Sequence, residues 1–258
     1  MNRVKTGIEG LDQMLGGGFL SETANLVEGA PGTGKTTLGM QFIHHGIMQQ
    51  DEPGLILTFE EFPHQYYRDA AIFGWDFRGL EQAGKLRVIM TSPEVSRADW
   101  ANVDGRIQAM SAEIGAQRIL VDSISHFERL TTDPVELRGI LYSFINALKR
   151  HGLTSILTRE SSALIGEAEA TEEDIAFVAD SYILLRYVEI ESAINKALLV
   201  LKLRGSDHAK DIRQFEITPR GIEVRSRFEG REGIMSGSPH RMADSFKAAF
   251  VKKRRGNE

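Results

Sequence analysis

The sequence predicts an α/β fold in which a mostly parallel central sheet carries helices on both faces and continues into a C-terminal antiparallel extension. Short runs of aliphatic and β-branched residues recur along the chain, and helical patterns separate them. Strands of a parallel sheet are buried on both faces and therefore read as nearly continuous apolar runs. The predicted parallel strands span residues 24–28, 54–59, 86–90, 118–121, 154–157 and 181–185.

One helix is marked at both of its ends. Asp133 stands at its N-cap, Pro134 at its first position and Glu136 where the carboxylate of a capping box would sit. Basic residues occupy the last turn, and Gly152 ends the helix. Between these ends, apolar residues at the helical period predict one buried face, formed by Ile140, Leu141, Phe144, Ile145 and Leu148.

The pattern changes after residue 195. Alternating runs at 196–203, 212–218 and 221–225 are separated by turns, which predicts antiparallel strands added to the same sheet. We therefore expect one large domain over residues 1–228. Residues 229–258 look like an appendage, because glycines and a proline interrupt them before a short helix predicted at about 243–253.

Composition narrows the class of protein. The chain of 258 residues has 41% hydrophobic residues, no cysteine and a net charge of −5. Without cysteine, disulfides and thiolate-bound metals are excluded. No window approaches the ~18 unbroken apolar residues of a membrane span, and the N-terminus lacks an apolar signal core. We expect a cytoplasmic protein without a membrane partner, and the negative charge argues against a surface built to hold nucleic acid.

A phosphate-binding loop follows the first predicted strand. The sequence there fits the P-loop pattern at every fixed position, and a helical pattern follows it to about Gln50. Backbone N–H groups of such a loop converge on phosphate oxygens, Lys35 would reach the β- and γ-phosphates of ATP, and the Thr36 hydroxyl would bind Mg²⁺. The predicted nucleotide contacts are Gly29, Ala30, Pro31, Gly32, Thr33, Gly34, Lys35, Thr36 and Thr37.

Three carboxylates are candidates for the chemistry beside the phosphates. Asp122 ends the predicted strand at 118–121, at the edge where open α/β sheets bind ligands, and is the predicted second Mg²⁺ ligand. Glu60 and Glu61 end the strand at 54–59, which we expect to lie next to the P-loop strand. They could orient and deprotonate water, although a pair of acids at a strand end is equally typical of a solvated turn.

The chain resembles the KaiC family of RecA-like ATPases, which includes the ATPase of the cyanobacterial clock. The resemblance runs from Thr6 to about Met242. It rests on the P-loop and on several further segments of the sequence. These are Thr6-Gly7-Ile8-Glu9-Gly10-Leu11-Asp12, Gly16-Gly17-Gly18, Thr58-Phe59-Glu60-Glu61, Phe73-Gly74-Trp75-Asp76 and Lys202-Leu203-Arg204-Gly205-Ser206-Asp207-His208.

The resemblance implies roles that spacing alone does not. It implies that Glu60 and Glu61 activate water, and that Lys202 and Arg204 are presented to the γ-phosphate held by a neighbouring subunit, with His208 also at the nucleotide. It therefore implies a homo-oligomeric ring, as a hexamer, with ATP between subunits. Cations that arrive from a neighbour offset the charge that develops on the transferring phosphoryl group.

The resemblance is closer to the second ATPase half of the clock protein, although only one half is present here. Segments 187–190 and 234–241 are similar to that half, and the latter resembles a gating loop that leads to a tail where a regulatory protein binds. The second half phosphorylates itself on an adjacent Ser and Thr. Ala176 and Phe177 stand at those positions, and neither has a hydroxyl.

Three functions stay open at this point. The first is a ring ATPase that acts as a switch or timer. The second is a kinase of itself or of another protein, which would use the same machinery with a hydroxyl in place of water. The third is a DNA-binding recombination accessory ATPase; its candidate loop, residues 160–174, contains acids and no Lys or Arg, which would repel phosphates.

Overall fold

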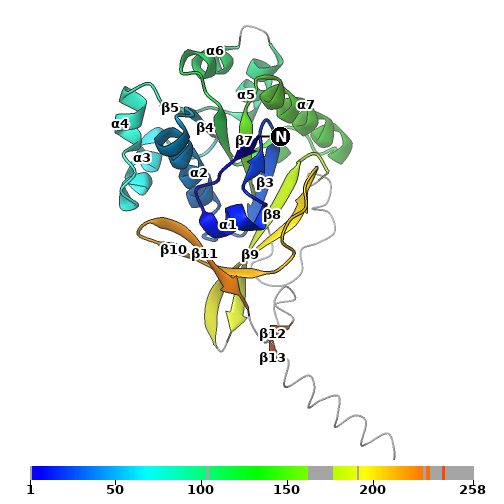
Figure 1. Cartoon of the computed structure of the whole chain (residues 1–258). Coiled ribbons are helices and arrows are strands. Elements are labelled where there is room, and N and C mark those ends of the chain that lie inside the picture. The colour runs from blue at the N-terminus through cyan, green and yellow to red at the C-terminus, as the bar shows by residue number, and fades with distance from the viewer. Residues whose placement is uncertain are drawn as a thin grey trace, which may run out of the picture.

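A central sheet of nine strands organises the computed structural model (Figure 1). The structure describes residues 2–102, 105–161, 177–190, 192–228, 231–232 and 240–241. The strands of the sheet are β3 (Ala24–Gly29), β4 (Gly54–Thr58), β5 (Leu86–Met90), β6 (Arg118–Asp122), β7 (Thr154–Glu160), β8 (Ser181–Ile190), β9 (Ala193–Leu203), β10 (Arg213–Thr218) and β11 (Gly221–Arg227).

The strand order confirms the predicted mixture of parallel and antiparallel pairing. From one edge to the other the order is β11-β10-β9-β8-β3-β7-β6-β4-β5. Pairing is parallel from β8 to β5 and antiparallel from β8 through β9 and β10 to β11. The carboxyl ends of the parallel strands therefore meet at one edge of the sheet, and their amino ends meet at the other.

Helices cover both faces of this sheet, as predicted (Figure 1). Side chains alternate along each strand, so that Val27 joins one core cluster and Leu26 the other. The first cluster packs against α1, α2, α3 and α4, and the second against α5, α6 and α7. The helices are α1 (Glu9–Met14), α2 (Lys35–Gln50), α3 (Pro63–Ile72), α4 (Phe77–Gln82), α5 (Pro93–Ala101), α6 (Arg106–Glu113), the 3₁₀ turn η1 (Ile124–Arg129) and α7 (Pro134–Arg150).

Helix α7 is the predicted helix, with one correction at its start. The Asp133 side chain accepts a hydrogen bond from the Val135 N–H at 2.9 Å, as an N-cap should. The capping box is wrong, because the Glu136 carboxylate accepts from the Thr131 hydroxyl at 2.6 Å. All five residues of the predicted apolar stripe are buried.

Two short ribbons accompany the main sheet. Strands β1 (Arg3–Val4) and β2 (Phe19–Leu20) pair antiparallel, as do β12 (Arg231–Glu232) and β13 (His240–Arg241). The predicted helix at 243–253, the acidic loop beyond Ser161 up to residue 174, and Ala176 lie outside the described residues.

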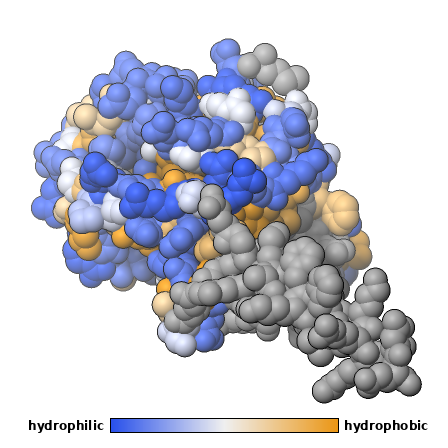
Figure 2. Space-filling view, turned by 60° about the horizontal axis from the view of Figure 1, so that its bottom comes forward, coloured by the Kyte–Doolittle hydropathy of each residue, from blue (hydrophilic) through white to orange (hydrophobic). Residues whose placement is uncertain are grey.

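Hydrophilic residues dominate the described part of the face seen in Figure 2, and hydrophobic residues show between them in smaller areas. Among the helices that the structure describes, none is long and apolar enough to cross a membrane. Most of the buried apolar side chains belong to the two clusters on either face of the sheet, and Val188 and Ala197 form a small third cluster.

Candidate functional site

The P-loop connects β3 to α2 at the carboxyl edge of the sheet. Gly32 has a φ of +76° and Gly34 a φ of +108°, a left-handed conformation that favours glycine. Ala30 and Thr33 are buried, whereas Pro31 and Gly32 are exposed. The glycines thus allow the tight turn that aims the N-terminus of α2 at the space above the sheet.

Lys35 begins α2 and folds back over the loop. Its Nζ donates to the carbonyl oxygens of Gly29 at 2.9 Å and Ala30 at 3.2 Å, and the residue is only 8% exposed. Burial lowers the pKa of Lys35, while the carboxylates of Glu160 and Asp122 act in the opposite direction. A buried cation held by neutral carbonyls is suited to an anionic group such as a phosphate.

Asp122 lies at the centre of a cluster at the end of β6. Its Oδ2 accepts hydrogen bonds from the hydroxyls of Thr36 and Tyr66, each at 2.8 Å. Its Oδ1 accepts from the Thr158 hydroxyl at 2.5 Å. The predicted pair of Mg²⁺ ligands is therefore in contact, and side chains from α3 and β7 fix the orientation of the carboxylate. Sequence reasoning missed Tyr66 and Thr158.

The donor set of this cluster fits Mg²⁺. A hydroxyl and a carboxylate are hard oxygen ligands, and Mg²⁺ in nucleotide sites is bound by one or two such groups together with phosphate and water. The described residues include no group of three or more His, Cys, Asp or Glu that could hold a metal. That result is expected for a site in which the nucleotide supplies the remaining ligands.

The two candidate base residues differ in their surroundings. Glu60 is exposed, with 72% of its side chain accessible, and its Oε2 lies 3.3 Å from His126 Nε2. Glu61 is half-buried. Burial raises the pKa of Glu61, and the nearby carboxylates of Asp122 and Asp69 raise it further.

The strand that carries this pair is not where we expected it. In the sheet, β4 pairs with β5 and β6, while β3 pairs with β7 and β8. Two strands therefore separate the glutamates from the P-loop strand, and the predicted adjacency is wrong. Thr58 pairs with Asp122, and Glu60 and Glu61 come directly after Thr58. The two glutamates therefore lie just beyond Asp122 at the same edge of the sheet.

Residues of the antiparallel extension contact the P-loop from its other side. Lys196 Nζ donates to the Gly32 carbonyl at 3.0 Å, and the Tyr187 hydroxyl donates to the Pro31 carbonyl at 3.3 Å. The ammonium of Lys196 lies 5.8 Å from the centre of the Tyr187 ring. Sequence analysis did not assign either residue to the site, because both stand on ordinary strand positions far along the chain.

Lys202 and Arg204 lie at the opposite edge of the sheet. Lys202 pairs with Tyr182, which pairs with Leu26, and Arg204 follows the end of β9. A strand rises about 3.3 Å per residue, so Arg204 lies roughly 16 Å from Gly29 along the strand direction, toward the amino edge of the sheet. An arginine side chain does not span that distance, so the structure does not bring these cations to the P-loop of their own chain.

Both cations rest instead on the segment before β8. Lys202 Nζ donates to the Ala179 carbonyl at 2.8 Å, and the Arg204 guanidinium donates to the Phe177 carbonyl at 2.6 Å. Phe177 is 55% exposed beside them. His208 lies in the loop after β9, where its N–H donates to the Asp207 carboxylate at 2.9 Å, and Thr37 is half-buried in the first turn of α2.

Comparisons with known proteins identify the family of the chain. A family model described as "ATPase: KaiC" matches residues 4–229. The circadian clock oscillator protein KaiC of Thermostichus vulcanus is 35% identical over 257 residues, which are 98% of this chain and 48% of that protein. The circadian clock protein KaiC3 of Synechocystis is 35% identical over 246 residues, covering 94% and 47%. The KaiC of a Nostoc species is 34% identical over 249 residues, covering 95% and 47%.

This chain therefore spans about half the length of the curated relatives that it matches. The match to the family model covers the P-loop, the carboxylate cluster and the two cations after β8. The resemblance predicted from the sequence is confirmed, and the chain belongs to the KaiC family of RecA-like ATPases.

Proposed function

We propose that the protein is a Mg²⁺-dependent ATPase that works as a ring, with each ATP bound between two subunits. One observation carries the proposal: the phosphate-binding groups and the cations Lys202 and Arg204 lie at opposite edges of one sheet. A cyclic arrangement, in which every subunit offers its P-loop to one neighbour and its cations to the other, is the simplest assembly that completes every site. A hexamer is the ring size that we propose.

Each group of the P-loop edge has a part in binding. Lys35 exchanges its carbonyl partners for the β- and γ-phosphate oxygens, which it holds with a fixed positive charge. The N–H groups at the start of α2 point at the same oxygens. Thr36 and Asp122 would hold Mg²⁺, which would supply positive charge against the β- and γ-phosphates. Tyr66 and Thr158 keep the Asp122 carboxylate oriented.

Glu61 is the stronger candidate for the general base. A base whose pKa lies closer to the working pH transfers protons with less penalty, and burial together with Asp122 raises the pKa of Glu61. Glu60 is more exposed and contacts His126, so we assign to it a part in orienting the water. Lys202 and Arg204 of the neighbour would offset the charge that develops on the transferring phosphoryl group.

Two measurements on the purified protein test the proposal. Phosphate release from ATP should require Mg²⁺, and the mass in solution should correspond to a ring when ATP is present. A protein that hydrolyses ATP at the same turnover per subunit as a stable monomer would contradict the assembly. A protein that assembles yet releases no phosphate in Mg²⁺ and ATP would contradict the ATPase.

The relatives are named as circadian clock proteins, and we propose that the ATPase here serves as a switch or timer. A regulatory protein that binds the tail within residues 229–258 would respond to the nucleotide state of the ATPase. Truncation after Met242 should leave a folded ring but change its turnover severalfold or abolish copurification of a partner. Unchanged turnover, assembly and copurification would contradict a regulatory tail.

A further inference from the structure

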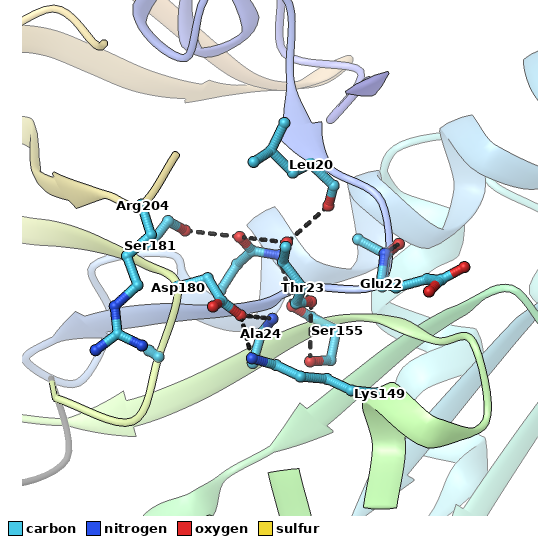
Figure 3. A network of polar contacts seen from close by, with 12 residues as sticks. Leu20, Glu22, Thr23, Ala24, Lys149, Ser155, Asp180, Ser181 and Arg204 are labelled. Carbon is cyan, nitrogen blue, oxygen red and sulfur yellow. Dashed lines mark hydrogen bonds and ion pairs between the residues drawn. The ribbon is translucent and has the colours of Figure 1, made fainter. Parts of the chain in front are cut away.

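A polar network joins the amino ends of β3 and β8 to the last turn of α7 (Figure 3). Asp180 is at its centre, directly before β8. Its N–H donates to the Ala24 carbonyl at 2.7 Å, and its Oδ2 accepts from the Ala24 N–H at 2.8 Å. The same Oδ2 lies 2.5 Å from Lys149 Nζ. Asp180 is thus fixed on two sides, by the first residue of the P-loop strand and by α7.

The other side of the same residue holds the backbone of Arg204. The Arg204 N–H donates to the Asp180 carbonyl at 2.8 Å, and Figure 3 shows the two residues side by side. The two carbonyls that receive the Lys202 and Arg204 side chains belong to Ala179 and Phe177, in the same short segment. The backbone of one cation and the side chains of both are therefore placed by residues 177–180.

That segment has no helix or strand of its own to hold it, since it is a turn that leads into β8. Val178 and Ala179 anchor it in the second core cluster. The Asp180 carboxylate adds charge-assisted contacts to Ala24 and Lys149, and its side chain is only 16% exposed, while that of Lys149 is 26% exposed. Removal of the carboxylate would take away the polar part of this anchoring, and the carbonyls that hold the two cations would be less firmly placed.

We propose that Asp180 is the positioning residue that aims Lys202 and Arg204 at the nucleotide of the neighbouring subunit. The proposal rests on the proposed function, in which these cations act across an interface. Asp180 touches no nucleotide in this account; it acts through the two cations. Lys149 supports it by holding the carboxylate.

The test uses full-length Asp180→Ala, Asp180→Asn and Lys149→Met, with Asp211→Asn as the matched control. Asp211 is also a partly buried aspartate, but it pairs with Arg213 at 2.9 Å and has no contact with the described residues of the Asp180 network. Asp180→Ala should bind ATP and assemble normally. Its kcat should fall on the order of 10²-fold with KM unchanged, because small displacements of catalytic groups have effects of that size. The kcat of Asp180→Asn and of Lys149→Met should fall by less, and that of Asp211→Asn should not change.

Mixed rings separate positioning from a general structural role. Lys35→Ala subunits have a defective P-loop but intact cations. Arg204→Ala subunits have an intact P-loop but lack one of the two cations. Asp180→Ala should regain turnover when mixed with Lys35→Ala and none when mixed with Arg204→Ala. Rescue of Arg204→Ala by Asp180→Ala, or a native rate for Asp180→Ala alone, would overturn the inference. If Asp180→Ala does not fold, the Asn and Lys149→Met variants carry the same test.

The control mixture distinguishes this inference from the function on which it rests. If Lys35→Ala and Arg204→Ala fail to rescue each other, the ring mechanism is wrong and the inference fails with it. If they do rescue each other while Asp180→Ala behaves like the control aspartate, only the role of Asp180 is wrong.

Discussion

The two edges of the central sheet hold their charged groups in different ways. At the carboxyl edge, side chains from α2, α3 and β7 converge on Asp122 of β6 within one chain. At the amino edge, Lys202 and Arg204 rest on backbone carbonyls beside the exposed ring of Phe177. The first edge brings binding groups together, and the second presents cations at the surface.

Because of this difference, we expect nucleotide binding and ATP turnover to depend on different edges of the sheet. Every group that we assign to phosphate and Mg²⁺ binding is available in one subunit, so a single subunit should bind nucleotide. In the proposed ring, the cations that favour the transition state would come from a second subunit, so turnover should depend on assembly. Changes at the two edges should therefore have different signatures, and the following variants test that distinction in order of expected effect.

Lys35→Ala should have the largest effect and abolish turnover, because it removes the fixed cation that spans the phosphates. Nucleotide binding, measured by fluorescence of an ATP analogue, should fall as well. Lys85→Ala is the control, since Lys85 makes a surface ion pair with Asp51 at 2.7 Å, and such a pair contributes little to stability. Native turnover in Lys35→Ala would show that the site is misassigned.

Arg204→Ala should reduce kcat on the order of 10³-fold, the lower end of the effect of a cation supplied by a neighbour. It should fold and bind ATP as the unaltered protein does, because its side chain is remote from the P-loop of its own chain. Arg225→Ala, which removes an exposed arginine paired with Glu216 and Glu223, should leave turnover unchanged. Equal losses in the two variants would contradict a specific role for Arg204.

Replacement of both Glu60 and Glu61 by Gln should slow turnover by at least about 10²-fold while leaving nucleotide binding intact, because the amides keep the size but lose the basicity. Single-turnover measurements would place the loss in the chemical step. Glu113→Gln, at an exposed position near Arg87, is the control. A double variant that binds ATP poorly yet turns over normally would be incompatible with the assigned base.

The smallest effect concerns the pH dependence of kcat. The base is active when deprotonated, so a raised pKa of Glu61 moves the acid limb of the profile to higher pH. Asp69 contributes to that raised pKa. Asp69→Asn should therefore shift the limb to lower pH, whereas Asp51→Asn should not. A limb that stays in place or moves upward in Asp69→Asn would exclude Glu61 as the titrating base.

Local patterns predicted the strands of the central sheet and helices α2 and α7 well. The parallel strands were recognisable because burial on both faces requires apolar runs, and the ends of α7 carry their own signals. The prediction ended β8 at Leu185, although the strand continues to Ile190. The strand passes through Arg186, whose buried guanidinium lies 3.8 Å from the carboxylate of Glu28, a contact that no local pattern shows.

Contacts between distant segments were not predictable in this way. Tyr66 and Thr158 are 56 and 36 residues away from Asp122, and neither belongs to a local motif. The place of β4 in the sheet was also missed, since strand order is set by the crossover connections and not by the composition of a strand. The roles of Lys202 and Arg204 came from the family resemblance alone, because a Lys-x-Arg on a strand is ordinarily a solvated edge.

The central claim is that a nucleotide site is complete only when two subunits meet, and a mixture of Lys35→Ala and Arg204→Ala subunits tests it most directly. Each variant alone should be nearly inactive. In a random one-to-one mixture, half of the subunits have an intact P-loop and half of their neighbours have intact cations, so turnover should recover to at most about a quarter of the native rate. Turnover in the mixture that equals only the average of the two separate variants would contradict the claim.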